Sequence, residues 1–208
     1  MRILSIFILL FSCFSYGADA NKMDIDLKDP NQVIRSVSVH TLTRINVERA
    51  HLDSDPAYIK TVIEEELIPY FNYKYAAYIV MGSYLKKTSK EQRDNFVKAF
   101  KNYLVNTYGH ILFEYKQQKF EVLDTPHFKD KTIISIAVKV RDDNNQVTNL
   151  VFKLRKNKKT SEWKVFDVIA EGVSMLNTKK SELGELIRKD GIDQVIKLLN
   201  QKNSEFVS

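Results

Sequence analysis

The sequence has almost no cysteine and none of the short motifs that mark common catalytic centres. Cys13 is the only cysteine among the 208 residues, and it lies in an N-terminal stretch that is expected to be removed after export. The remaining chain would have neither a disulfide nor a thiol nucleophile. GxSxG, phosphate-loop and dinucleotide-binding glycine patterns do not occur in the sequence. These absences argue against the common hydrolase and nucleotide-binding classes.

Histidine is also scarce, and its spacing does not suit a metal site. The four histidines are isolated from one another, without HxxxH or HExxH spacing: His40, His51, His110 and His127. Asp142, Asn144 and Gln146 alternate like the start of a calcium loop, but the glycine at its sixth position and the distal glutamate are missing. We therefore interpret residues 142–145 as a hairpin turn and expect no metal ion or other cofactor.

One long apolar run occurs in the chain, and it has the features of a secretory signal. Arg2 supplies a positive charge, residues 3–14 are almost entirely apolar, and Ala18-Asp19-Ala20 forms a small-x-small cleavage site. The run is too short for a transmembrane helix, which needs about 20 residues. We expect residues 1–20 to be a signal peptide cleaved near Ala20. A competing interpretation is a lipoprotein signal with Cys13 as the lipid-modified residue.

The expected mature chain, residues 21–208, has a basic surplus and the size of a single domain. Cleavage removes one basic and one acidic residue, so the formal net charge stays at +6. A positive surplus favours anionic partners, such as lipid headgroups or acidic protein surfaces. Nucleic acid is not expected, because the chain carries an export signal and lacks helix-turn-helix, zinc-finger and RNP-like spacing.

The first half of the chain predicts helices. Asp29-Pro30 and Asp55-Pro56 each combine an N-cap oxygen with a proline that suits the first helical turn. Ser89, with Gln92 three residues later, forms a capping box before a longer periodic segment. The helices expected from these signals and from the 3.6-residue period cover residues 30–51, 56–67, 73–81 and 90–115.

The second half changes to a period of two and predicts strands. We expect strands at residues 120–123, 132–140, 147–155 and 163–170, joined by turns at 142–145 and 157–160. Two short helices, at residues 179–189 and 192–200, follow the last strand. This order predicts an α+β fold in which helices pack on one side of a twisted antiparallel sheet. The residue pattern alone suits a filled core as well as a cavity.

Five segments, in the same order, resemble the MlaC family, also called the toluene-tolerance auxiliary component. The most specific is WKVFDVIAEGVSM at residues 163–175. The others lie at residues 66–84 (ELIPYFNYKYAAYIVMGSY), 89–109 (SKEQRDNFVKAFKNYLVNTYG) and 130–140 (DKTIISIAVKV), with LGELIRKDGID following at 183–193. Family members are periplasmic phospholipid carriers of Gram-negative bacteria, so the resemblance implies a monomeric lipid carrier in the periplasm.

The resemblance also implies a binding site and partners. The helices and sheet would enclose an apolar lipid cavity, and the carrier would exchange phospholipid with an outer-membrane MlaA–porin complex and, through MlaD, with the inner-membrane MlaFEDB transporter. Such exchange would maintain the lipid asymmetry of the outer membrane. The side chains expected to contact the lipid are Tyr78, Phe96, Phe100, Tyr103, Leu104, Tyr108, Ile111, Ile134, Ile136, Val138, Leu150, Phe152, Leu154, Phe166, Val168 and Val173.

Two other functions stay open at this point. One is a periplasmic adaptor or chaperone with a filled core and a protein-binding surface. The other is an enzyme that acts on a lipid through Asp167 or Glu171, because a carboxylate on a buried strand can have a raised pKa and act as a base. Either carboxylate could instead be structural, with Glu171 holding the turn at Gly172 or Asp167 pairing with a cation.

Overall fold

The computed structural model describes residues 25–114, 118–142 and 144–205 of the chain. The expected signal peptide and Tyr115 lie outside these residues. The helical segments are α1 (Pro30–Val47), α2 (Arg49–Ser54), η1 (Pro56–Tyr58), α3 (Ile59–Glu66), η2 (Ile68–Tyr70), α4 (Tyr73–Met81), η3 (Gly82–Lys87), α5 (Lys90–Phe113), α6 (Met175–Asp190) and α7 (Ile192–Glu205). The strands are β1 (Lys119–Leu123), β2 (Ile133–Arg141), β3 (Val147–Lys156), β4 (Trp163–Ala170) and β5 (Val173–Ser174). The predicted α+β class is confirmed.

Local capping explains why most helices begin where the sequence predicts. The Asp29 carboxylate accepts hydrogen bonds from the backbone N–H groups of Asn31 and Gln32. The predicted capping box between Ser89 and Gln92 is present in both directions at the start of α5. These contacts satisfy N–H groups that have no partner inside the helix.

Several helices differ from the predicted ranges, and among them α7 runs to Glu205 rather than to residue 200. The first breaks at Glu48 into α1 and α2, and the second begins as the short 3-10 turn η1 before α3. The helix predicted from residue 179 begins earlier, at Met175, because Ser174 caps it through the Asn177 N–H group. A serine cap inside a segment with strand-like residues is a weak signal in the sequence. The 3.6-residue period alone therefore placed the start of α6 too late.

The sheet is a five-stranded antiparallel meander in the order β1-β2-β3-β4-β5. A β-bulge between Lys153 and Leu154 leaves Phe166 of β4 without a partner in the register. The two-residue strand β5 was not predicted. It returns along β4 after Glu171 and Gly172, which have φ angles of 46° and 81°. Positive φ at both central residues is the geometry that a tight hairpin favours.

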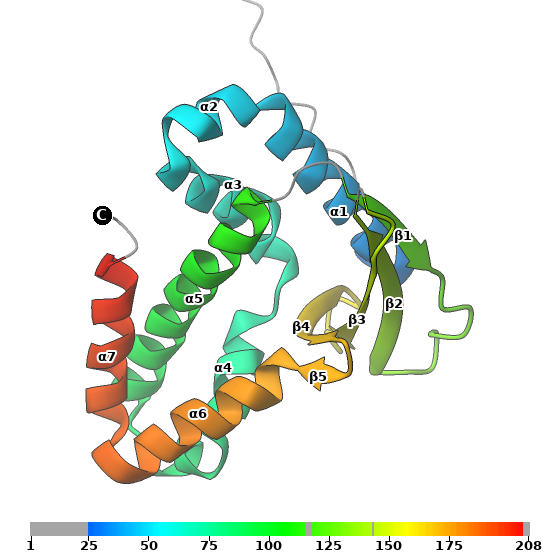
Figure 1. Ribbon diagram of the computed structural model, residues 1–208. Helices are drawn as coiled ribbons and strands as arrows, with labels where there is room; N and C mark the ends of the chain where they lie inside the picture. Colours follow the sequence, from blue (N-terminus) through cyan, green and yellow to red (C-terminus); the bar gives the residue numbers. More distant parts are fainter. Residues whose placement is uncertain (1–24, 115–117, 143, 206–208) are drawn as a thin grey trace, which may run out of the picture.

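Helices cover the sheet in two groups (Figure 1). Helix α1 lies along the sheet, and its Val33, Ile34 and Val37 belong to the same buried cluster as residues of β2, β3 and β4. Helices α4, α5, α6 and α7 form a second group, whose buried cluster includes Phe96 and Phe100 of α5. Phe166 joins this second cluster from β4. The space between the two groups is where a cavity forms.

Candidate functional site

A cavity of about 420 Å³ lies between the sheet and the helices. Its volume falls within the range of roughly 300–1,000 Å³ that is usual for ligand pockets. The wall is almost wholly apolar. It is formed by Val33, Ile34, Val37, Ser38, Thr41 and Leu42 of α1; Ile63 of α3; Leu67, Ile68, Tyr70 and Phe71 after it; Ala76 of α4; Phe100, Leu104, Val105, Tyr108, Ile111 and Leu112 of α5; Phe120 of β1; Leu150 and Phe152 of β3; Val165, Phe166, Asp167, Val168 and Ala170 of β4; and Met175, Leu176 and Lys179 of α6.

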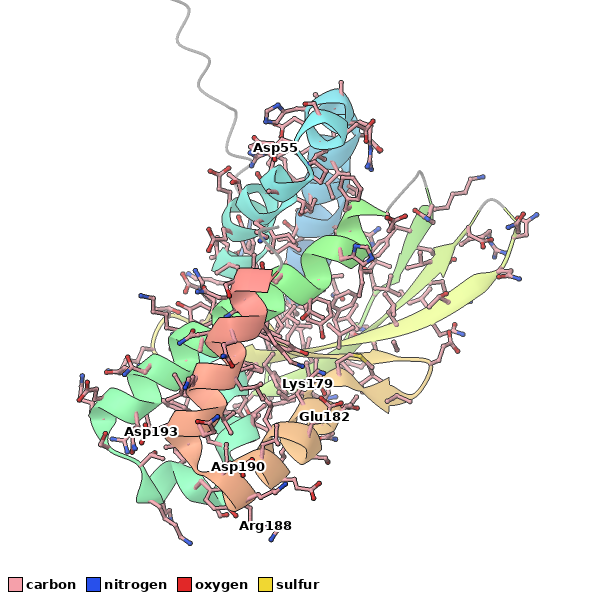
Figure 2. The ribbon with its side chains drawn as sticks, turned by 60° about the vertical axis from the view of Figure 1, so that its left-hand side comes forward. Asp55, Lys179, Glu182, Arg188, Asp190 and Asp193 are labelled. Carbon is pink, nitrogen blue, oxygen red and sulfur yellow. The ribbon has the colours of Figure 1, made fainter. Side chains whose placement is uncertain are left out.

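The cavity opens to water beside α5 and α6. Ile111 of α5 lines the cavity and is nevertheless 60% exposed, and the side chain of Lys179 on α6 is also partly exposed. A side chain that faces both the cavity and the solvent marks the mouth. The mouth therefore combines an apolar edge from α5 with a cation from α6, Lys179, which is labelled in Figure 2.

The cavity wall includes part of the set of residues predicted to contact lipid. The predicted residues on the wall come from α5, β3 and β4: Phe100, Leu104, Tyr108, Ile111, Leu150, Phe152, Phe166 and Val168. These predicted residues bring α5, β3 and β4 together around one cavity. They remain the residues predicted to contact a ligand.

The other predicted residues lie outside the wall, for three physical reasons. Ile134, Ile136, Val138 and Leu154 are covered in the close-packed cluster that contains α1. Phe96 is fully buried among the helices, where Tyr78 and Tyr103 pack against the same cluster. Val173 is 55% exposed on β5. The period-2 pattern correctly assigned β2 an apolar face, but it carries no information about whether a helix fills the space above that face.

Helix α1 supplies cavity residues that the sequence did not single out. Its apolar face was predicted, but the same face serves both the packed cluster and the cavity. Thr41 was not a candidate, although its side chain lies on the wall and its hydroxyl has no hydrogen-bond partner within the described chain. A buried hydroxyl without a partner is unfavourable unless a ligand or water satisfies it.

The two carboxylates considered for catalysis occupy structural positions. Asp167 is buried and accepts hydrogen bonds from the Ser174 hydroxyl, at 2.8 Å, and from the Leu176 N–H group, at 3.0 Å. It therefore fastens the start of α6 to β4. Glu171 is exposed in the turn and accepts a hydrogen bond from the Asn149 N–H group on β3. One carboxylate thus lies on the cavity wall, whereas the other holds the hairpin.

Two tyrosines on the wall have raised pKa values. Burial is the main cause of the raised pKa of Tyr108, and Lys179 acts in the opposite direction. Burial also raises the pKa of Tyr70, with a further contribution from the negative charge of Glu66. Both phenols are consequently neutral hydrogen-bonding groups at ordinary pH, rather than bases.

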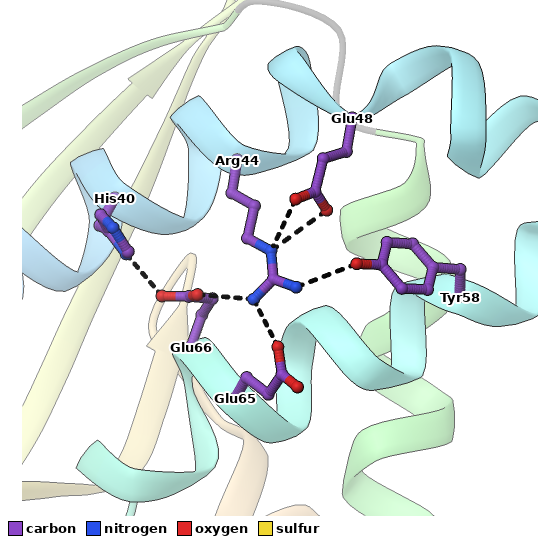
Figure 3. Close-up of polar contacts among 6 residues, drawn as sticks. All are labelled: His40, Arg44, Glu48, Tyr58, Glu65 and Glu66. Atoms are coloured by element: carbon purple, nitrogen blue, oxygen red, sulfur yellow. Dashed lines mark hydrogen bonds and ion pairs between the residues drawn. The ribbon is translucent and has the colours of Figure 1, made fainter. Parts of the chain in front are cut away.

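A polar network fastens α1 to α3 behind the cavity (Figure 3). The Arg44 guanidinium donates to Glu48, the residue that follows α1, to Glu66 of α3 at 2.7 Å and to the Tyr58 hydroxyl at 3.0 Å. It also forms an ion pair with Glu65, and Nδ1 of His40 contacts Glu66. The pKa of Arg44 is raised, because these hydrogen bonds together outweigh the opposing effect of burial. The network fixes the distance between two helices that both supply cavity wall.

The described residues hold no group of three His, Cys, Asp or Glu side chains placed to bind a metal ion. In the same part of the chain, each helix is too short or too polar to cross a membrane. The feature of this part best suited to an apolar ligand is the cavity, whose few polar side chains include Thr41, Tyr108 and Lys179.

The model of the MlaC protein family matches residues 35–201, which include every residue that lines the cavity except Val33 and Ile34. The chain belongs to the MlaC family. It is 34% identical over 178 residues to the intermembrane phospholipid transport system binding protein MlaC of Haemophilus influenzae, an alignment that covers 85% of this chain and 83% of the relative. It is 23% identical over 172 residues to the toluene tolerance protein ttg2D of Pseudomonas putida, which covers 82% and 79%.

A solved structure has the same fold as this member of the MlaC family. The phospholipid-binding protein of Ralstonia solanacearum, determined in complex with a phospholipid, superposes with a TM-score of 0.77. The match covers 86% of this chain and 99% of that protein, at 19% sequence identity. At this identity the similarity establishes the shared fold.

Proposed function

We propose that the protein is a carrier that binds a glycerophospholipid by its acyl tails in the cavity between α1, α5 and the sheet. The observation that carries the proposal is the cavity itself, which is large, almost wholly apolar and open at one side. A monomeric protein of this size would otherwise fill such a space with side chains. The names of the relatives from Haemophilus and Ralstonia, which refer to phospholipid transport and binding, support the same ligand.

The energetic need for a carrier follows from the acyl chains. Exposing apolar chain to water costs about 0.8 kcal/mol for each CH₂ group, so a lipid with two tails does not cross an aqueous space unprotected. A cavity walled by leucine, isoleucine, valine and phenylalanine replaces the bilayer interior during the transfer. No covalent chemistry is required for this role, and we propose that the protein is not an enzyme.

We further propose that the carrier works in the periplasm as a monomer. Residues 1–20 have the features of a cleaved secretory signal. Family membership supports exchange of lipid with an outer-membrane MlaA–porin complex and with the inner-membrane MlaFEDB transporter through MlaD, which would maintain the lipid asymmetry of the outer membrane. The net charge of +6 suits docking on acidic protein surfaces or anionic lipid headgroups.

The test is mass spectrometry of the mature protein, purified without detergent and extracted with organic solvent. We expect a glycerophospholipid in a fixed molar ratio to the protein. A well-folded protein that contains no lipid, and that takes up none from vesicles, would contradict the proposal and favour the adaptor. Release of fatty acid or headgroup from the vesicles would favour an enzyme instead.

A further inference from the structure

Lys179 is the one cationic side chain on the cavity wall, judged over the described residues. It lies one turn into α6, and its side chain is 24% exposed, so the ammonium group is at the mouth rather than deep among apolar residues (Figure 2). Lysine commonly packs its apolar stem against such a surface and places its charge at the edge. A single cation at the mouth of an apolar cavity gives the cavity a polar end.

The position of Lys179 is fixed by the start of α6. The Asp167 carboxylate accepts hydrogen bonds from Ser174 and from the Leu176 N–H group, and it thereby fastens the first turn of α6 to β4. Both oxygens of Asp167 are used in these contacts, one for each donor. Lys179 therefore projects from a helix whose position relative to the cavity is set by a buried hydrogen-bonded carboxylate.

The ammonium group of Lys179 still has a donor available. It forms an ion pair with Glu182 at 2.7 Å and lies 5.4 Å from the centre of the Tyr103 ring. Burial acts to lower its pKa, but hydrogen bonds to Glu182 and to Tyr103 outweigh that effect and leave the pKa raised. An ammonium has three N–H donors, and the hydrogen bond to Glu182 uses one of them. The pair with Glu182, half of whose side chain is exposed, is of the kind that contributes little to stability.

Tyr108 of α5 completes the polar end of the cavity. It lines the same cavity as Lys179. Burial raises the pKa of the Tyr108 phenol, and the charge of Lys179 acts in the opposite direction. Because the pKa remains raised, the phenol keeps its proton and can donate a hydrogen bond. An ammonium and a hydroxyl donor at one end of an apolar cavity form a site for an oxyanion.

We propose that Lys179 and the Tyr108 hydroxyl bind the phosphate of the carried lipid at the cavity mouth. The inference rests on the carrier function proposed above. Charge-assisted hydrogen bonds from an ammonium to a phosphate oxygen are among the stronger polar contacts in proteins. They would hold the lipid with its headgroup beside α6 and its tails directed inward, past Leu104 of α5 and Phe152 of β3 toward α1. A free phosphate ion has the same chemistry, so the test must separate the two sources.

The test compares two lipids with identical acyl tails, a phosphatidylglycerol and the corresponding diacylglycerol, on delipidated protein. We expect Lys179→Gln to weaken phosphatidylglycerol binding about tenfold, as the loss of one partly exposed charge-assisted contact predicts. Binding of the diacylglycerol should be unchanged. Lys179→Arg should keep the wild-type affinity for both lipids within about twofold, and Tyr108→Phe should weaken only phosphatidylglycerol, by about threefold.

Lys180→Gln is the matched control. It removes the same charge from the next residue of α6, which is exposed and does not line the cavity. If Lys180→Gln weakens phosphatidylglycerol as much as Lys179→Gln does, general electrostatic attraction is responsible and the proposed site is wrong. Equal losses for both lipids in Lys179→Gln would also overturn it, because they would indicate a change in packing.

Two further outcomes separate this inference from the carrier function. If the wild type binds neither lipid, the carrier proposal fails; if it binds both, and Lys179→Gln binds phosphatidylglycerol unchanged, only the phosphate site fails. Inorganic phosphate at millimolar concentration should not displace phosphatidylglycerol, because it lacks the tails. Displacement by inorganic phosphate alone would assign the site to the free ion and overturn the role in holding a lipid.

Discussion

Two adjacent parts of one sheet face behave in opposite ways. On β2, Ile136 and Val138 are buried in a close-packed cluster with α1. Their partners in the register on β3, Phe152 and Leu150, line the cavity. Residues directly opposite each other in an antiparallel pair lie on the same face of a sheet. The packed cluster and the cavity are thus only one strand apart on the same face of the sheet.

The difference comes from what covers the strands. Val33, Ile34 and Val37 of α1 pack in one cluster with the buried residues of β2 and also line the near wall of the cavity, whereas α5 and α6 approach the β3 and β4 side without filling it. The strand residues themselves are similar: β2 and β3 both present isoleucine, valine, leucine or phenylalanine. The cavity is therefore a property of the tertiary arrangement rather than of strand composition.

The largest expected effect comes from placing a charge on each side of this boundary. Val138→Arg would bury an unpaired guanidinium in the packed cluster and overfill it, so we expect a loss of more than about 3 kcal/mol in the free energy of unfolding. Leu150→Arg, at the opposite position in the register, points into existing space. That variant should remain folded and lose its lipid.

Circular dichroism, denaturant unfolding and lipid extraction of both variants measure the contrast. The pair is well matched, because the two positions receive the same side chain on facing strands. Two equally stable variants would show that the β2 side is as open as the β3 side. Two unfolded variants would show that no usable space exists above β3, and the cavity would then be closed in solution.

How far the sequence predicted this boundary depends on the range of the interactions involved. The start of α5 was predicted well because Ser89 and Gln92 bond within one turn, and a turn of helix is visible in the local sequence. The start of α6 was placed late because one of its capping groups, Asp167, comes from a neighbouring strand. Leu150 and Val138 could not be told apart, because the helices that cover them are distant in the chain.

The second expected effect concerns α1, the helix that belongs to both regions. Arg44→Met removes the cation between α1 and α3 and leaves Glu66, whose side chain is only 14% exposed, without its strongest partner. We expect a loss of about 1–2 kcal/mol in the free energy of unfolding, less than for a fully buried pair because Arg44 is partly exposed. Denaturant titration measures the loss.

Arg35→Met on the same helix is the control for Arg44→Met. Arg35 pairs with Asp124, and both side chains are more than half exposed, so this change should stay within about 0.5 kcal/mol of the wild type. If the two variants are equally stable, the network around Arg44 does not fix α1 on α3, and the cavity wall on that side depends on apolar packing alone.

The smallest expected effect lies on the hollow side, at Asp167. Asp167→Asn keeps the size of the side chain, and its oxygen can still accept from Leu176 while its amide donates to the Ser174 hydroxyl; the charge-assisted part of both hydrogen bonds is lost. We expect a loss of about 1 kcal/mol in stability and unchanged transfer of phospholipid between vesicles.

Glu171→Gln, in the exposed turn, should alter neither quantity measurably. A catalytic carboxylate behaves differently, because an amide cannot act as a base and the rate would fall at least ~10²-fold. If the wild type hydrolyses lipid and Asp167→Asn does not, the cavity is an active site and the carrier proposal is wrong.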